Sequence, residues 1–133
     1  MRVLALDYGA ARCGCALSDP TGTIVTPIEP IAKPATRRGM TAIAQLVEAR
    51  EVEHVVVGLP LSLRGEDTDQ TRETRSFAAM LAARLEREVP VELHDERFTT
   101  RIAASMEHAR ASEDSRAAAI LLEGWLGRSQ ART

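Results

Sequence analysis

The sequence contains no long apolar run. No stretch approaches the roughly 18 consecutive apolar residues that a transmembrane helix requires, which excludes a membrane-spanning helix. The apolar run at the start, residues 3–6, is too short for the hydrophobic segment of a signal peptide and ends at an acid, Asp7. We therefore expect a cytoplasmic protein.

Internal repeats and linkers are also missing. With 133 residues, of which 44% are hydrophobic, the chain can bury a core but is short for two domains. We expect a single domain over residues 1–127. Residues 128–133 are expected to form a disordered tail.

The chain has no strong charge imbalance. Its net charge is −2, so it lacks the overall basicity of many nucleic-acid-binding domains. A nuclease is not excluded, because it needs acids for metal and only local basic charge. Lys33 is the only lysine among 17 basic residues, a bias that genome base composition explains at least as well as phosphate binding by arginine.

Cysteine is scarce, with Cys13 and Cys15 the only two. Being two residues apart on a strand, they point to one face and cannot readily form a disulfide with each other. No further cysteine or histidine follows at zinc-binding spacing. We predict that both are small buried side chains in a reducing compartment.

Apolar patterns predict strands and helices in the order β-β-β-α-β-α-β-α-α. The expected strands cover residues 3–6, 13–17, 24–31, 55–57 and 91–94. The expected helices begin near residues 36, 68, 99 and 112, and the last three end near residues 88, 110 and 127. Pro27 and Pro30 place the third strand at a sheet edge. This order predicts an α/β fold with a mixed sheet and helices on both faces.

Acidic residues stand at the ends of two predicted strands and at the start of a helix. Asp7 closes the first strand, and Asp95 and Glu96 close the last. The ends of parallel strands meet at one sheet edge, and Asp114 begins a helix whose first turn can face that edge. Acids that converge repel one another unless a cation compensates them. Carboxylate oxygens suit magnesium or manganese, and a pair of such ions would support phosphoryl transfer.

Each acid also has a simpler interpretation. Asp7 follows a strand, where aspartate often forms a turn. Asp114 stands where it could cap the last helix. Glu96 could form a surface ion pair with Arg97. The spacing alone does not separate these alternatives from metal binding.

Four blocks along the chain form a recognisable set. They are LDYGAARCG at residues 6–14, VVVGLPL at 55–61 with Gly65, DERFTT at 95–100, and DSRAAAILL at 114–122. Together they resemble the YqgF family, also called RuvX, of pre-16S rRNA nucleases that were formerly described as Holliday junction resolvases. A lone D-x-G pattern also occurs in sugar kinases and actin-like ATPases, but the four blocks at this chain length are specific.

The resemblance implies a ribonuclease H-like fold with a five-stranded mixed sheet in the order 3-2-1-4-5. It implies that Asp7, Glu96 and Asp114 are the catalytic residues and bind Mg²⁺ or Mn²⁺, as two ions. The implied function is phosphodiester hydrolysis in the maturation of the 5′ end of 16S rRNA. A ribosomal RNA precursor and the ribosome are the implied partners.

Two other functions stay open. A Holliday junction resolvase would act on branched DNA through two sites related by two-fold symmetry, and the sequence does not reveal the oligomeric state. An RNA-binding ribosome assembly factor would use the fold without cutting, although clustered acids near phosphate argue against it. An actin-like ATPase would need a second, duplicated domain, which 133 residues cannot supply.

Further residues around the acids are predicted to bind substrate: Gly9, Arg12, Gly58, Pro60, Arg97, Thr99 and Thr100. Gly9 can adopt a positive φ and keeps bulk away from the metals. Arg12 either binds phosphate or pairs with a nearby acid. The segment from Gly58 to Pro60 is expected to form a stiff loop over the site. The last three residues either hold phosphate or serve locally, Arg97 by orienting Glu96 and the threonines by capping a helix.

The chain departs from the family pattern at several positions. Arg116 stands where an apolar residue is usual, which predicts an exposed or substrate-facing position. The segment between Thr100 and Asp114 is shorter than the basic stretch of many members, so one candidate nucleic-acid contact is missing. His94 could act as a general base, but a histidine packed near the end of the sheet is the favoured interpretation.

Overall fold

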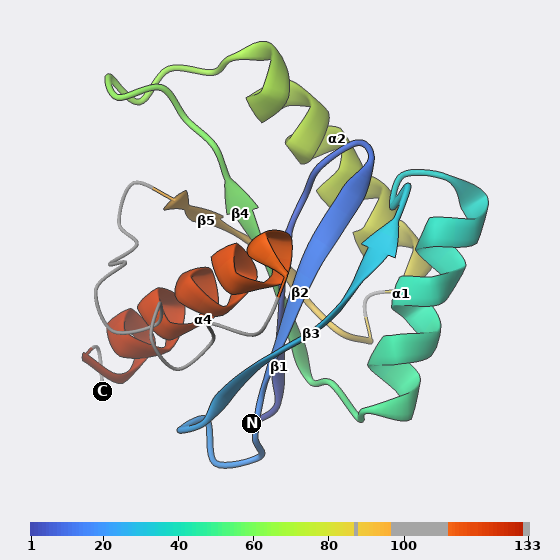
Figure 1. Cartoon of the computed structure of the whole chain (residues 1–133), viewed down its shortest axis with the longest axis vertical. Coiled ribbons are helices and arrows are strands. Elements are labelled where there is room, and N and C mark those ends of the chain that lie inside the picture. Colours follow the sequence, from blue (N-terminus) through green and yellow to red (C-terminus); the bar gives the residue numbers. More distant parts are fainter. Residues whose placement is uncertain (87, 97–111, 132–133) are drawn as a thin grey trace.

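The computed structural model describes residues 1–86, 88–96 and 112–131 (Figure 1). Its strands are β1 (Val3–Asp7), β2 (Arg12–Ser18), β3 (Val25–Ala32), β4 (His54–Leu59) and β5 (Val91–Asp95). Its helices are α1 (Arg37–Ala49), α2 (Asp69–Arg84) and α4 (Glu113–Ala131). The helix predicted near residues 99–110 lies outside the described residues. Among the helices that are described, none is long and apolar enough to cross a membrane.

The five strands form one sheet in the order β3-β2-β1-β4-β5. β1 and β2 are antiparallel, as are β2 and β3, whereas β4 is parallel to both β1 and β5. β1 lies at the centre between β2 and β4, and nearly all side chains of these three strands are buried. β3, which contains Pro27 and Pro30, forms an edge, as predicted. The predicted mixed sheet with the ribonuclease H-like strand order is therefore confirmed.

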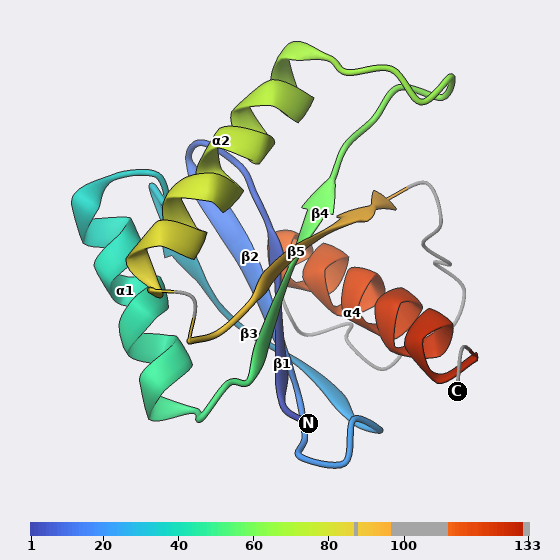
Figure 2. The ribbon, with the colours of Figure 1, turned by 180° about the vertical axis from the view of Figure 1, so that it is seen from behind.

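Helices cover both faces of the sheet, with α1 and α2 on one side and α4 on the other (Figure 2). Alternate strand residues supply the two cores. The core under α1 and α2 includes Leu4, Leu6, Cys13, Cys15, Val55, Val57, Ile43, Phe77 and Leu81. The core under α4 includes Val3, Ala5, Ala16, Val56, Leu122 and Trp125. By the same alternation, Asp7, Arg12 and Gly14 point to the α4 side of the sheet.

Both cysteines are fully buried, as predicted. The pKa of the Cys13 thiol is raised well above its usual value, through its hydrogen bond with Cys15 and then through burial. A thiol held in its neutral form is a poor nucleophile and a poor metal ligand. Both cysteines lie in the core under α1 and α2, on the face of the sheet opposite the acids, so they contribute to packing.

The helix starts agree with the predictions, and two helix ends do not. Thr36 caps α1, where its side chain accepts a hydrogen bond from Gly39, and Thr68 caps α2. α2 ends at Arg84 rather than near residue 88, because Glu86 adopts a left-handed φ of 56°. α4 continues beyond residue 127 to Ala131, so residues 128–131 are helical and not a disordered tail. Gly127 lies inside this helix, because a glycine costs a helix about 1 kcal/mol but does not by itself end it.

Candidate active site

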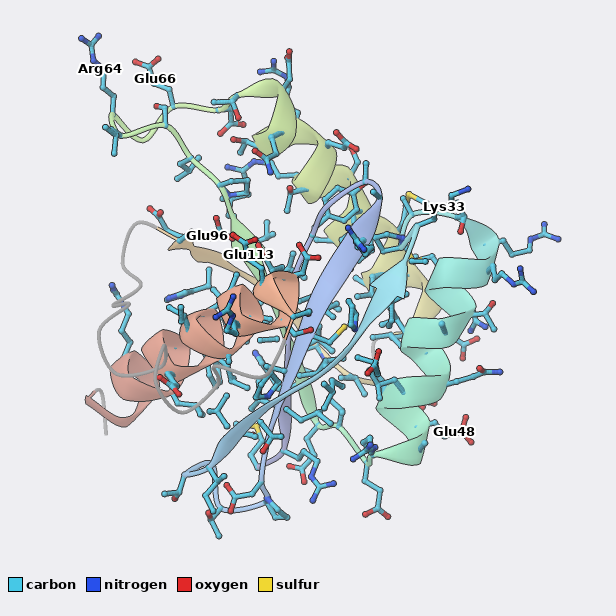
Figure 3. All side chains as sticks on the ribbon, viewed as in Figure 1. Lys33, Glu48, Arg64, Glu66, Glu96 and Glu113 are labelled. Atoms are coloured by element: carbon cyan, nitrogen blue, oxygen red, sulfur yellow. The ribbon has the colours of Figure 1, made fainter. Side chains whose placement is uncertain are left out.

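Three acids from three elements come together on the α4 side of the sheet. Asp7 is the last residue of β1, Glu96 follows β5, and Asp114 lies in the first turn of α4. The side chains of Asp7 and Glu96 share a hydrogen bond, and the charge of Asp114 acts on Asp7. Figure 3 shows Glu96 beside the start of α4. The tertiary structure thus assembles the predicted triad.

Asp7 lies where its negative charge is disfavoured. Burial raises the pKa of Asp7, the hydrogen bond with Glu96 opposes this shift, and the negative charge of Asp114 adds to it. A hydrogen bond between two carboxyl groups also requires that one of them hold a proton. The cluster therefore disfavours full ionisation of its three acids, and a cation in place of the proton would relieve this.

Two glycines allow the acids to approach each other. A Cβ atom at Gly58 would lie 2.5 Å from Oε1 of Glu96 and 3.0 Å from its Cγ. A Cβ atom at Gly14 would overlap the backbone oxygen of Asp114 and lie 2.9 Å from the Ser115 nitrogen. Gly58 of β4 thus leaves room for the side chain of Glu96, and Gly14 of β2 leaves room for the helix turn that carries Asp114. Gly58 lies within β4 and not in a loop, which corrects the prediction for this residue.

Ser115 fixes the first turn of α4 to the sheet. Its buried hydroxyl donates to the carbonyl of Ile28 at 2.6 Å and accepts from the backbone nitrogen of Cys15 at 3.3 Å. The cap of this helix is Ser112, whose hydroxyl accepts from the Ser115 nitrogen at 3.2 Å. Asp114 is therefore not the helix cap. Ser115 was not among the predicted site residues, although a serine beside Asp114 at the start of the apolar helix was a usable signal.

Arg12 pairs with an acid of the triad. Its Nε lies 3.6 Å from Oδ2 of Asp114, and its side chain remains 67% exposed. The structure thus contains the ion pair that the sequence left as one alternative. An exposed guanidinium in this place is also open to a phosphate, so binding of substrate by Arg12 stays a prediction.

Gly9 serves the turn between β1 and β2 through its size. A Cβ atom there would lie 2.6 Å from the carbonyl oxygen of Arg12. The predicted positive φ at Gly9 is wrong, because the described glycines with positive φ are Gly22 and Gly65. A close approach of two backbone segments, not a left-handed conformation, explains the glycine.

Tyr8, beside Asp7, links the site to α2. Its ring stacks on Phe77 with centroids 4.6 Å apart, and its hydroxyl donates to Glu73 at 3.0 Å. Burial and the Glu73 carboxylate raise the pKa of Tyr8 to about 12, so it remains a neutral donor. The hydroxyl of Thr71 in the same helix donates to the carbonyl of Pro60, which fastens the loop after β4. The sequence did not indicate this role of Tyr8, because its partner is 65 residues away.

The other predicted site residues fall into two groups. Arg97, Thr99 and Thr100 lie outside the described residues. His94 is buried within β5, which agrees with a packed histidine, and Arg116 is half-buried on α4 rather than exposed.

The donor set of the cluster fits a hard cation such as Mg²⁺ or Mn²⁺, because all side-chain donors are carboxylate oxygens. In the part of the chain that the structure describes, no group of three acidic, histidine or cysteine side chains is placed so that it could hold a metal ion as it stands. Asp7 and Glu96 are engaged with each other and Asp114 with Arg12. A divalent ion would favour the ionised form of Asp7, which burial and the charge of Asp114 disfavour.

Sequence comparison places the chain in a family. Residues 1–128 match the family model of RuvX, described as "Holliday junction resolvase". The chain belongs to the RuvX family. A RuvX relative from Maridesulfovibrio salexigens, named "Putative pre-16S rRNA nuclease", is 38% identical over 97% of this chain and 100% of its own. One from Mycobacterium leprae with the same name is 36% identical over 99% of this chain and 76% of its own.

Solved structures of resolvases share the RuvX fold. RuvC from Thermus thermophilus in complex with a Holliday junction substrate superposes with a TM-score of 0.65 at 15% identity, covering 97% of this chain and 96% of RuvC. The Fowlpox virus resolvase in complex with junction DNA has a TM-score of 0.54 at 11% identity, covering 99% of this chain and 97% of its own. At such identities the likeness shows the fold alone, which is ribonuclease H-like.

Proposed function

We propose that this RuvX protein is a metal-dependent nuclease that hydrolyses phosphodiester bonds in the 5′ maturation of pre-16S rRNA. The observation that carries the proposal is the convergence of Asp7, Glu96 and Asp114, together with the raised pKa of Asp7. Clustered acids of this kind are unfavourable without a cation, and next to a phosphate they are useful only with one.

Each residue of the site has a proposed role. Asp7, Glu96 and Asp114 would hold Mg²⁺ or Mn²⁺, as two ions. When bound, the metal supplies a Lewis acid for the phosphate oxygens and lowers the pKa of a bound water. Arg12, released from or shared with Asp114, would hold a phosphate oxygen of the substrate. Tyr8 fastens the end of β1 to α2, and Ser115 fastens the start of α4 to the sheet. Each thus holds an acid-bearing segment in place.

The choice of RNA as substrate rests on the names of the relatives in Maridesulfovibrio salexigens and Mycobacterium leprae. The family description and the likeness to junction-bound RuvC favour branched DNA as the second candidate. A resolvase must cut two strands, so this alternative also requires a symmetric dimer. A non-catalytic assembly factor is the third candidate, and the triad argues against it because uncompensated carboxylates repel phosphate.

One experiment separates the three candidates. The purified chain is incubated with Mn²⁺ and end-labelled substrates: an RNA that carries the 16S 5′ precursor junction, a DNA duplex and a four-way DNA junction. We expect cleavage of the RNA and loss of cleavage in Asp7→Asn and Glu96→Gln variants. Cleavage confined to the four-way junction would support the resolvase, and RNA binding without any cleavage would support the assembly factor.

A further inference from the structure

A group of basic residues lies at the same sheet edge as the acidic triad. β3 ends at Ala32, the register partner of Arg12, and the backbone nitrogen of Lys33 donates to the carbonyl of Ala11 at 2.9 Å. Four residues later Arg37 begins α1. Figure 3 shows Lys33 at the end of α1 nearest the β1–β2 turn. We call Lys33, Arg37 and Arg38 the basic corner.

The basic corner carries charge that nothing else in the described structure neutralises. All three side chains are exposed, and none forms an ion pair with a described residue. No acid occurs between Glu29 and Glu48, although the chain as a whole has a net charge of −2. Two exposed arginines of α2, in contrast, pair with acids, Arg72 with Asp69 and Arg75 with Asp67.

The positions of these three residues lower the stability of the fold. Arg37 and Arg38 occupy the first turn of α1, which contains no acid, so the positive end of the helix dipole repels them. Lys33 has a φ of 45°, a left-handed conformation that glycine and asparagine adopt more readily. Gly39 lies against the backbone of Lys33, where a Cβ atom would overlap its carbonyl oxygen. The backbone of the corner is thus held in a fixed conformation. It carries three cations whose positions the stability of the fold does not favour.

We propose that the basic corner binds the phosphate backbone of the nucleic acid on the strand that flanks the reacting phosphodiester. The inference rests on the proposed function in one respect, that the acids at this edge act on a nucleic acid. The acidic triad repels phosphates, so affinity must come from cations placed to one side of it. Arg12, paired with Asp114 and opposite Ala32 in the sheet register, lies between the triad and the corner. Arg12 and the corner thus form a basic track that leads away from the metal site.

The two amines of the chain allow a direct test. Lys33 supplies the only lysine amine, and the amine of Met1 donates to the carbonyl of Pro20 near the start of β1, at the opposite sheet edge. The chain is acylated with a limiting amine-reactive ester in EDTA, with and without an RNA or a DNA oligonucleotide of the same sequence. We expect several-fold slower acylation of Lys33 in the complex and no change at Met1. Equal reactivity of Lys33 in free and bound chains would overturn the proposal.

Variants give a second readout. Replacing the corner by Lys33→Gly, Arg37→Gln and Arg38→Gln removes three phosphate contacts, which should lower the salt slope of single-strand binding by about 2. Between 50 and 200 mM salt, the variant should therefore lose about 20-fold less affinity than the wild type. Thermal stability should be equal or higher. Glycine adopts the left-handed conformation of position 33 without strain, and the two glutamines remove the repulsion between the helix dipole and the arginines. Arg84→Gln, at the far end of α2, is the matched control and should leave the salt slope unchanged.

The outcomes separate this inference from the proposed function. Protection of Lys33 by RNA or DNA in EDTA, together with no cleavage in the Mn²⁺ assay, supports the corner and contradicts the nuclease. Cleavage with an unchanged salt slope in the triple variant overturns the corner and leaves the nuclease standing. Protection by anionic lipid vesicles but by neither oligonucleotide would also overturn the corner. Protection by RNA alone, DNA alone or both supports the proposal and identifies the nucleic acid that the corner binds.

Discussion

At the scale of single residues, the charge of Asp7 opposes the stability of the folded chain when no metal is bound. Its pKa is raised by burial and by Asp114, so the folded state disfavours the charged carboxylate. A group of this kind contributes its full stability below the pKa of the unfolded chain. That contribution is lost as the pH rises through the higher pKa of the folded state. At neutral pH and without metal, Asp7 therefore destabilises the fold.

Asp7→Asn should raise the melting temperature at pH 7 in EDTA, because the amide keeps a hydrogen-bonding side chain and carries no charge. The gain should fade toward pH 3, where the wild-type carboxyl is protonated in both states. Melting curves from pH 3 to pH 8 measure this difference, and calorimetry should show loss of Mn²⁺ binding. Asp69→Asn, a fully exposed acid on α2, is the control for the metal measurement. A variant less stable than the wild type at every pH would contradict the charge argument.

Asp114 can now be tested without the ambiguity of a helix cap. Ser112 caps α4, so Asp114→Ser should leave the metal-free melting temperature close to that of the wild type. Serine offers one neutral oxygen where the ion requires an anionic one, so Mn²⁺ binding and nuclease activity should be lost. Ser112→Ala should behave in the opposite way, losing about 1 kcal/mol of stability and keeping metal binding. RNA cleavage at the wild-type rate by Asp114→Ser would remove Asp114 from the site.

At the scale of elements, the position of α4 decides whether the site exists. Near its C-terminal end, Trp125 donates to Glu92 of β5 at 2.8 Å and stacks on His54 of β4, with ring centroids 5.0 Å apart. Near its N-terminal end, Ser115 bonds to β2 and β3. The helix is thus fixed at both ends, and Asp114 can rest on the bare backbone of Gly14.

Ser115→Ala should destabilise the protein by about 1–3 kcal/mol, because it leaves the buried Cys15 nitrogen and Ile28 carbonyl without this partner. It should also weaken Mn²⁺ binding through displacement of Asp114, although Ser115 does not touch the metal. Denaturant unfolding can be followed by Trp125, the only tryptophan and itself part of α4. Ser76→Ala, on the exposed face of α2, is the matched control. Unchanged metal affinity in Ser115→Ala would show that the helix start does not depend on this anchor.

At the scale of the whole molecule, the three acids come from segments that are far apart in the sequence. β1, the end of β5 and the start of α4 meet only in the folded chain, so metal binding should be linked to global folding. Mn²⁺ at about 100 times its dissociation constant should add about 2.7 kcal/mol to the free energy of unfolding. The measurement is a melting temperature against Mn²⁺ concentration. Asp7→Asn should show no metal-dependent rise, and an equal rise in both proteins would place the metal elsewhere.

The sequence by itself determined the features that depend on local pattern. Strands β1 and β4, the edge position of β3 and the starts of α1 and α2 follow from apolar periodicity, proline and capping chemistry within a few residues. Asp7 and Glu96 could be paired in advance because the ends of parallel strands share an edge. The helix ends were less predictable, since glycine tolerance in α4 and the left-handed turn after α2 depend on packing.

Only the tertiary structure decided how the acids are held and charged. Gly14 accommodates the backbone of a residue 100 positions later, and Tyr8 finds Glu73 across 65 positions. No local pattern records such contacts, because they depend on which surfaces meet when the sheet and helices pack. The raised pKa of Asp7 has the same origin, since burial and the approach of Asp114 exist only in the folded chain. The basic corner likewise becomes a feature of the site only because β3 ends at the same edge as β1.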